Sequence, residues 1–169
     1  MTEVTIRAEG VEDEPAIRAL LRDAFGASAE ADLVEALRGR SDVRFLVALD
    51  GARRVGHVGL SPVRVPGLAA EELALGLAPL AVADGARGAG VGAALVRAAL
   101  EEARARGACA VVVLGDPAYY ARFGFAPAAR FDLACRWTSG DAFQALELRP
   151  GALAPACGVV EYLPEFDAC

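Results

Sequence analysis

Residues 80–92 read LAVADGARGAGVG, an apolar run followed by a turn with glycine at 85, 88, 90 and 92. The apolar run predicts the end of a strand, and the helical spacing of apolar residues after it predicts a helix over 93–106. Glycine lacks a Cβ, so the backbone of such a turn can approach a ligand closely. The first N–H groups of a helix have no partner within it and carry partial positive charge. We therefore expect main-chain N–H groups, helped by Arg87, to bind a phosphate-containing ligand here.

The segments around this corner predict a mixed α/β (α+β) fold. Alternating apolar residues indicate strands over 2–8, 44–48, 55–65 and 72–82, with helices from about Pro15 to Gly26 and over 29–38. The β-branched run 110–114 predicts a central strand. A short helix with Tyr119 and Tyr120 follows, then strands over 142–148 and 157–163. Antiparallel strands ahead of one crossover unit argue against a purely alternating βαβ design. Without a linker, we expect one domain spanning 1–169.

Composition excludes several functional classes. The 169 residues are 55% hydrophobic, which is enough for a buried core and excludes a disordered chain. All 17 basic residues are Arg, so neither Schiff-base chemistry nor a P-loop lysine is available. His57 is the one histidine, which excludes a multi-histidine zinc site, and we expect no metal. A net charge of −6 disfavours binding to nucleic acid.

Cysteine usage and the apolar stretches indicate where the protein resides. The cysteines at 109, 135, 157 and 169 form no CxxC pair, so we expect buried free thiols in a reducing compartment. The longest uncharged stretch, 73–83, is too short to span a membrane. The acidic N-terminus lacks the pattern of a signal peptide. These features predict a cytoplasmic protein without a membrane partner.

The glycine turn fits two phosphate-binding patterns. Gly88-x-Gly90-x-x-Ala93 matches the dinucleotide pattern GxGxxA. A dinucleotide fold, however, places that turn near the start of a parallel sheet and an acidic residue at the end of the next strand. Here antiparallel strands come first, and Asp116 lies too far along. A nicotinamide or flavin oxidoreductase is therefore disfavoured.

The second pattern, Arg87-x-x-Gly90-x-Gly92, resembles the acetyl-CoA motif [QR]xxGx[GA] of the GNAT-type N-acetyltransferases. The segment Tyr120-Ala-Arg-Phe-Gly-Phe resembles the Tyr-x-x-x-Gly-Phe segment after the fifth strand of that family. The longer strings LAPLAVADGARGAGVG and LGDPAYYARFGF resemble the YhbS-like subgroup of predicted acetyltransferases. The resemblance runs from about residue 3 to 166.

This resemblance implies a GNAT fold, a mixed, mostly antiparallel twisted sheet with a bulged, splayed central strand pair and flanking helices. It implies that acetyl-CoA is the cosubstrate and that Tyr120 is the general acid. The Val82 amide would polarise the thioester carbonyl. The backbone positions matching the pantetheine arm are Leu80, Ala81 and Val82, and those matching the pyrophosphate loop are Arg87, Gly88, Ala89, Gly90, Val91, Gly92 and Ala93.

The implied activity is transfer of an acetyl group from acetyl-CoA to a primary amine, by direct attack in a ternary complex. The acceptor would be a small molecule or a peptide. Within the same fold, transfer of a longer acyl group and a non-catalytic CoA-binding or sensor protein are the alternatives. A homodimer through the C-terminal strands is compatible with the sequence.

The general base is left open. The position where some GNAT enzymes carry a glutamate is Gly76 here. His57 lies on the preceding predicted strand and could take a proton from an ammonium group, and Glu72 lies at the start of the same predicted strand as Gly76. A structural histidine and a surface glutamate are the plainer interpretations of both. His57, Glu72 and water are therefore all candidates.

Overall fold

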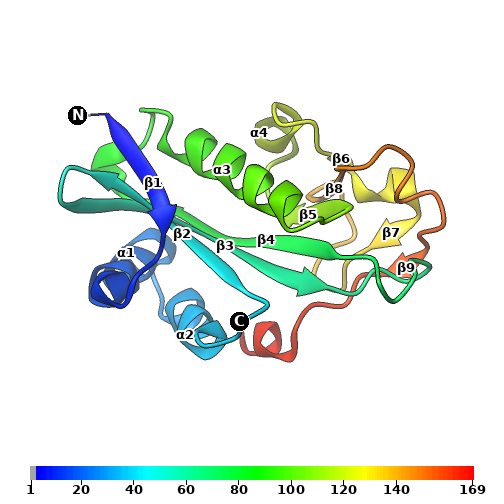
Figure 1. The fold of residues 1–169 in the computed structure, drawn as a ribbon, viewed down its shortest axis with the longest axis horizontal. Coiled ribbons are helices and arrows are strands. Elements are labelled where there is room, and N and C mark those ends of the chain that lie inside the picture. The colour runs from blue at the N-terminus through cyan, green and yellow to red at the C-terminus, as the bar shows by residue number, and fades with distance from the viewer. Residues whose placement is uncertain (1–2) are drawn as a thin grey trace. The chain divides into compact units, whose positions relative to one another are not determined.

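The computed structural model describes residues 3–169 and contains a seven-stranded sheet with helices on its faces (Figure 1). The strand order is β1-β2-β3-β4-β5-β8-β6, and a separate pair, β7-β9, completes the strands. The strands are β1 (Val4–Ala8), β2 (Arg44–Asp50), β3 (Arg53–Val63), β4 (Ala74–Val82), β5 (Ala110–Leu114), β6 (Ala126–Pro127), β7 (Leu133–Ala134), β8 (Phe143–Glu147) and β9 (Gly158–Val159). The α-helices are α1 (Glu14–Phe25), α2 (Ala29–Leu37), α3 (Val91–Ala105) and α4 (Pro117–Ala121).

The sheet is mixed and mostly antiparallel, as the sequence predicts. β1 with β2, β2 with β3, β5 with β8, and β6 with β8 all pair antiparallel. β4 and β5 pair in parallel over three residue pairs, from Ala74↔Ala110 to Gly76↔Val112. This register ends at Gly76, while β4 itself continues to Val82. The limited pairing fits the splayed central strands that the resemblance implies.

The chain forms two compact units, and β3, β4 and α3 each contribute residues to both. The first unit comprises 3–60, 79–99 and 164–169, and the second comprises 61–78 and 100–163. The prediction of one domain over 1–169 therefore stays a prediction. The units are described one at a time below.

In the first unit, helices cover both faces of the strands. α1 and α2 lie side by side on one face (Figure 1), where Ile17, Leu21 and Val34 pack with Val47 of β2. On the other face, α3 packs against Gly56 of β3. A Cβ on Gly56 would lie 2.7 Å from Leu95 Cδ1, so the missing side chain allows this close approach.

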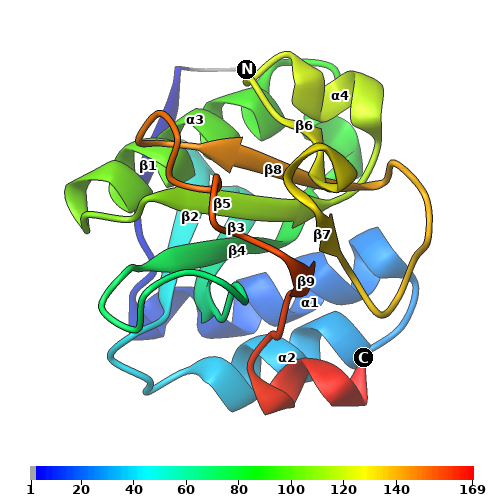
Figure 2. The same ribbon diagram turned by 90° about the vertical axis from the view of Figure 1, so that its right-hand side faces the viewer.

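The second unit is built on β5, β8 and β6, with the β7-β9 pair beside them (Figure 2). Its core joins Val112 of β5 and Phe143 of β8 to Leu153 from the segment after β8. The predicted strand over 110–114 coincides with β5. It is buried from Ala110 to Val113, as the β-branched run predicts for a central strand, and Leu114 at its end is exposed.

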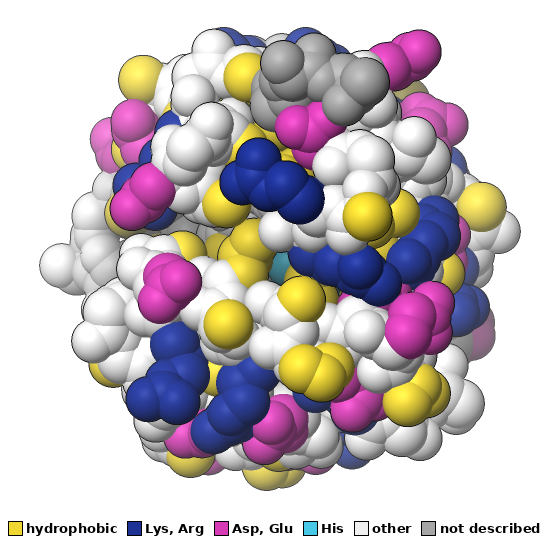
Figure 3. Space-filling model, turned by 90° about the vertical axis from the view of Figure 1, so that its left-hand side faces the viewer, with side chains coloured by type: hydrophobic (Ala, Val, Ile, Leu, Met, Phe, Trp, Pro, Cys, Tyr) yellow, Lys and Arg dark blue, Asp and Glu magenta, His cyan; other side chains and the backbone are white. Residues whose placement is uncertain are grey.

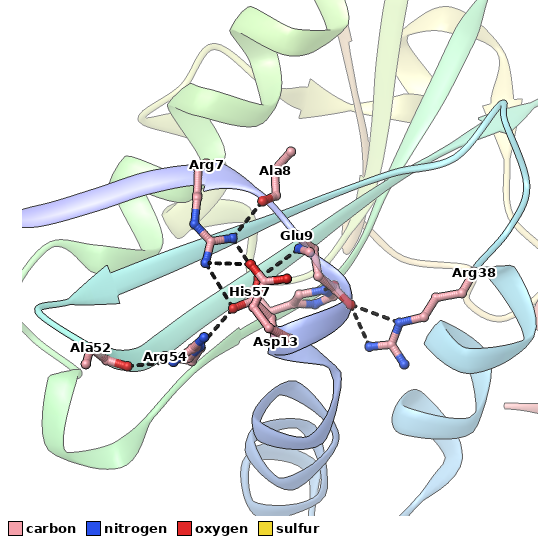
Figure 4. A network of polar contacts seen from close by, with 10 residues as sticks. Arg7, Ala8, Glu9, Asp13, Arg38, Ala52, Arg54 and His57 are labelled. Carbon is pink, nitrogen blue, oxygen red and sulfur yellow. Dashed lines mark hydrogen bonds and ion pairs between the residues drawn. The ribbon is translucent and has the colours of Figure 1, made fainter.

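Asp13 is the centre of a charged network in the first unit (Figure 4). Its fully buried carboxylate accepts hydrogen bonds from Arg7 at 2.6 and 3.0 Å, from Arg54 Nε at 2.8 Å and from the Gly10 N–H at 2.8 Å. The hydrogen bonds from Arg7 hold the pKa of Asp13 well below its ordinary value of 3.8. Four hydrogen bonds from three residues thus fix the chain between β1 and α1 to β3.

Several sequence-based expectations need correction. The strand predicted over 157–163 is confined to Gly158–Val159, and Glu161 makes one isolated bridge to Arg64, because Pro164 follows closely and the segment lies outside the main sheet. Cys109 and Cys135 are buried free thiols as expected, but Cys157 and Cys169 are exposed. Thr2, the predicted start of the first strand, lies outside the described residues.

Candidate functional site

The corner between β4 and α3 has the strand–turn–helix form that the sequence predicts. β4 ends at Val82, a single helical turn spans Asp84–Ala86, and α3 begins at Val91. Gly88 and Gly90 adopt φ values of +76° and +84°, in the left-handed region that favours glycine. A Cβ built on either glycine would meet no atom within 4 Å. The glycines are therefore needed for the backbone path, and the space beside them is open.

The N–H groups at the start of α3 are oriented by the helix itself. The Ala94 N–H donates to the Gly90 carbonyl at 3.0 Å, which closes the first turn. The N–H groups of the three preceding residues, Val91 to Ala93, have no carbonyl within the helix to bind. Gly88, Ala89 and Gly90 are exposed, while Gly92 and Ala93 are partly exposed. A phosphate group fits this corner, since it would accept hydrogen bonds from these N–H groups at the positive end of the helix.

Arg87 folds back onto β4. Its Nε donates to the Val82 carbonyl at 3.3 Å, and its Nη1 lies 3.2 Å from Asp84 Oδ1. The guanidinium remains more than half exposed, at 56%. It thus links the end of β4 to the turn and also supplies positive charge at the corner. Sequence reasoning predicted the charge but not the bond to Val82.

The last residues of β4 alternate in burial. Leu77, Pro79 and Ala81 are buried, while Leu80 and Val82 are partly exposed. Ala81 packs with α1 and α2 in the core of the first unit. Since Ala81 points into that core, the neighbouring side chains lie on the opposite face of the strand. The predicted binding residues Leu80, Ala81 and Val82 therefore offer backbone groups and small apolar surface to a ligand.

Tyr120 belongs to the second unit, where α4 holds it among aromatic rings. Its ring contacts those of Tyr119, Phe123 and Phe125 at centroid distances of 5.0, 6.4 and 5.7 Å. Burial, with a smaller contribution from Tyr119, raises the pKa of Tyr120 to about 12. The phenol is therefore protonated at neutral pH and can donate a hydrogen bond. Asp116 caps the start of α4, since its Oδ1 accepts the Ala118 N–H at 2.9 Å.

His57 is completely buried in the first unit. Its Nε2 lies 2.6 Å from Glu9 Oε2, and its ring stacks on Phe45 at 5.2 Å. Glu9 also accepts two hydrogen bonds from Arg38, at 2.9 and 2.6 Å (Figure 4). The hydrogen bonds from His57 and Arg38 outweigh burial and hold the pKa of Glu9 below its ordinary value. This arrangement gives His57 a structural partner and no exposed surface.

Glu72 and Gly76 lie in the second unit. The Glu72 carboxylate binds Arg149 at 2.8 and 3.2 Å, and that pairing lowers the pKa of Glu72. At Gly76, a Cβ would lie 2.9 Å from Tyr162 Cε1 and 3.1 Å from Val63 Cγ1. Tyr162 thus fills the space where the resemblance places a glutamate side chain. Sequence reasoning missed Tyr162, because nothing local in the sequence links it to β4.

The remaining features bear on metals and surfaces. Within residues 3–169, no group of three or more His, Cys, Asp or Glu side chains is arranged to hold a metal ion. None of the helices in that range is long and apolar enough to cross a membrane. On the face shown in Figure 3, arginines and acidic side chains are interspersed, so that face carries no continuous basic field.

The model of the acetyltransferase (GNAT) family matches residues 14–125, which include β4, the glycine turn, α3 and Tyr120. The chain belongs to the GNAT family. It is 44% identical over 166 residues to the uncharacterized N-acetyltransferase YhbS of Escherichia coli K12, covering 96% of this chain and 98% of that one. This match confirms the YhbS-like resemblance.

Two solved GNAT structures resemble the chain over nearly its full length. The structure of E. coli YhbS in complex with CoA has a TM-score of 0.90 and 42% identity, covering 99% of this chain and 93% of that one. A GNAT acetyltransferase from Brucella melitensis in complex with acetyl-CoA has a TM-score of 0.80 and 32% identity, with coverages of 99% and 100%. Both confirm the GNAT fold for this chain.

Proposed function

We propose that this GNAT protein transfers an acetyl group from acetyl-CoA to a primary amine. The observation that carries the proposal is the corner between β4 and α3, where Gly88 and Gly90 expose the start of a helix in a chain without lysine. The similar structures that contain CoA and acetyl-CoA support the same ligand here. The cofactor-binding residues in this proposal are Leu80, Ala81, Val82, Arg87, Gly88, Ala89, Gly90, Val91, Gly92 and Ala93.

In the proposed complex, the N–H groups at the start of α3 bind the diphosphate, and the backbone of β4 aligns the pantetheine arm. The Val82 N–H then donates to the thioester carbonyl, where negative charge develops during attack. One well-placed donor of this kind contributes about 3 kcal/mol. Binding also holds the amine about 3 Å from the carbonyl carbon. This lowers the activation barrier further, because the entropy cost of bringing the two reactants together is met on binding.

Tyr120 is the proposed catalytic residue and acts on the sulfur. With its pKa raised to about 12, the phenol gives up its proton less readily than an ordinary tyrosine, but it can still donate a hydrogen bond. Full proton transfer to a thiolate near pKa 8.5 is uphill by about 1.4 kcal/mol for each unit of difference. Tyr120 therefore keeps its proton and stabilises the departing sulfur with a hydrogen bond. The proton released by the attacking nitrogen is the one that the sulfur gains as the thiol forms.

The amine must lose a proton before it attacks. His57 is buried against Glu9, and the Glu72 carboxylate is bound to Arg149. Water is therefore the proton acceptor in this proposal. The reaction consumes a neutral amine and a thioester and yields an amide and the free thiol. The net charge of −6 favours cationic acceptors, such as polyamines, amino sugars or lysine side chains.

The decisive experiment measures release of CoA from acetyl-CoA with a panel of such primary amines. CoA is quantified by chromatography, because the exposed Cys157 and Cys169 would react with thiol-detecting dyes. We expect amine-dependent release that falls about 10²- to 10⁴-fold in kcat in Tyr120→Phe. Tyr119→Phe, which removes the neighbouring hydroxyl, is the matched control and retains most activity.

A non-catalytic CoA sensor of the same fold predicts a different result. In that case calorimetry would detect binding of CoA, but no amine in the panel would stimulate its release from acetyl-CoA. That outcome contradicts the proposed transfer and leaves the binding corner intact. Absence of any binding heat at millimolar CoA would contradict both functions.

A further inference from the structure

Gln144 is a buried polar residue in the second unit that no part of the proposed reaction uses. It lies on β8 opposite Val113 of β5 and is 1% exposed. Its Nε2 donates to the Gly115 carbonyl at 3.3 Å and approaches the Ala142 carbonyl at 3.4 Å. Among the residues that the structure describes, its Oε1 has no hydrogen-bond partner although it is buried.

This arrangement contributes little to stability. Both bonds of the Gln144 amide are long, and an acceptor left without a donor in the interior costs free energy. An apolar side chain of the same length would fill the same space without that cost. The fold alone therefore does not account for an amide at this position.

The amide instead fixes the backbone of Gly115. The Gly115 N–H donates to the Ala142 carbonyl at 2.9 Å, while its own carbonyl accepts from Gln144. The peptide groups on both sides of Gly115 are thus bound to β8 or to the residue just before it. Gly115 directly follows β5 and precedes α4, so this attachment sets where α4 begins.

Gly115 is also the surface against which the Tyr120 ring rests. A Cβ on Gly115 would lie 2.6 Å from Tyr120 Cε2 and 3.2 Å from its Cδ2. The backbone of Tyr120 is also bound to the residue that follows Gly115, because the Tyr120 N–H donates to the Asp116 carbonyl at 3.1 Å. A movement of the Gly115 peptide would therefore move the phenol.

We propose that Gln144 is a positioning residue for Tyr120: its amide holds the Gly115 carbonyl and thereby sets the position of the phenol. This inference rests on the proposed catalytic role of Tyr120. Gln144 acts through the backbone and touches no reacting atom. Its effect should appear in turnover rather than in coenzyme binding.

Gln144→Met tests the proposal, since it keeps the length of the side chain and removes the donor. We expect an unchanged or higher melting temperature and an unchanged Kd for CoA. We expect kcat to fall by about 10- to 100-fold, because a displacement near 1 Å at a reacting group can cost 10²-fold. Val160→Ala, a buried position of the same unit far along the chain, is the control for loss of packing. It should lower the melting temperature and leave kcat per folded molecule near the native value.

A second measurement does not depend on activity. In protein labelled with ¹³C at the tyrosine Cζ atoms, the Tyr120 resonance is assigned by its absence in Tyr120→Phe. We expect this resonance to shift in Gln144→Met and in Gly115→Ala, whose added Cβ presses on the ring, but not in Val160→Ala. Gly115→Ala also serves if Gln144→Met folds poorly.

The results separate the two proposals. Normal turnover in Gln144→Met with an unmoved Tyr120 resonance overturns the positioning role, as does a loss of activity that merely follows the folded fraction. If Tyr120→Phe retains full activity, the catalytic role of Tyr120 fails instead. In that case the ¹³C shift alone decides whether Gln144 positions the ring.

Discussion

Tyr162 and Gly76 occupy complementary space: the tyrosine Cε1 would lie 2.9 Å from a Cβ on the glycine. Tyr162 comes from the segment after β9, whereas Gly76 is the last β4 residue paired with β5. The absence of a side chain on β4 is therefore matched by a ring from a distant part of the chain. Burial raises the pKa of Tyr162, so its hydroxyl is protonated at neutral pH and is a poor base.

Gly76→Ala should destabilise the protein by about 1–3 kcal/mol, the usual cost of overpacking. Both the ring of Tyr162 and Val63 Cγ1 would have to move. The measurement is urea unfolding followed by circular dichroism. In the Tyr162→Leu background the cost of Gly76→Ala should be smaller, because contacting residues couple. Equal costs in the two backgrounds would show that the ring does not fill this space.

Gly90→Ala should weaken CoA binding, whereas Gly85→Ala should not. Gly90 has φ +84°, and an L-residue in the left-handed region costs about 1–2 kcal/mol. Gly85 lies in the same turn, has no positive φ and has open space beside it, which makes it a matched control. Isothermal calorimetry with CoA measures both. If the two variants bind CoA with equal affinity, the corner between β4 and α3 is not part of the CoA-binding site.

Asp13→Asn should cost about 3–5 kcal/mol of unfolding free energy, because it leaves Arg7 and Arg54 without their buried counter-charge. The control is Asp32→Asn, which breaks the exposed pair with Arg18 and should cost much less, because solvent screens exposed ion pairs. Both are measured by urea unfolding at pH 7. A similar small loss in both variants would show that burial adds nothing to the Asp13 network.

The lowered pKa of the Asp13 carboxylate predicts a loss of folding stability at acid pH. The pKa of Asp13 is lower in the folded protein than its ordinary value of 3.8, so the unfolded chain binds the proton first. Its contribution is fully present above that value and is lost as pH falls toward the folded pKa. Unfolding between pH 2 and pH 7 should therefore show a shallower acid decline in Asp13→Asn than in the native protein. Parallel declines would assign the loss at acid pH to other carboxylates.

The raised pKa of Tyr120 predicts a loss of folding stability at alkaline pH. Its pKa is about 12 in the folded protein and 10 ordinarily, so the unfolded chain releases the proton first as pH rises. The stability contribution is complete below pH 10 and is lost between pH 10 and 12. Tyr120→Phe should reduce this loss, measured by unfolding at pH 9 to 11. Tyrosinate absorbance rising fully near pH 10 in the native fold would contradict the prediction.

Local patterns predicted most elements of the fold. The strand over 110–114 and the glycine turn before α3 were both predicted. A buried strand and a turn with positive φ each depend on the residue types within a short stretch of sequence. α3 begins at Val91, two residues before the predicted start, since the turn closes onto Gly90. The corner of the candidate site was likewise predicted from the sequence.

The surroundings of the candidate bases were not predictable in this way. His57 was one of three candidate bases, with a structural histidine as the plainer interpretation, and the sequence did not indicate that Glu9, 48 positions earlier, binds its Nε2. Glu72 looked like a surface charge, yet it binds Arg149 from the segment after β8. Each partner is distant in sequence, and a single sequence gives no signal for such pairs.

The sequence by itself thus determined which segments form helices and which form strands, where the glycine turn without a lysine lies, and which family the chain resembles. The tertiary structure alone decided that Tyr162 covers Gly76, that Gln144 binds Gly115, and that two of the four cysteines are exposed. The physical reason is range. Backbone propensity and burial patterns act between neighbours, while side-chain contacts depend on which distant segments the sheet brings together.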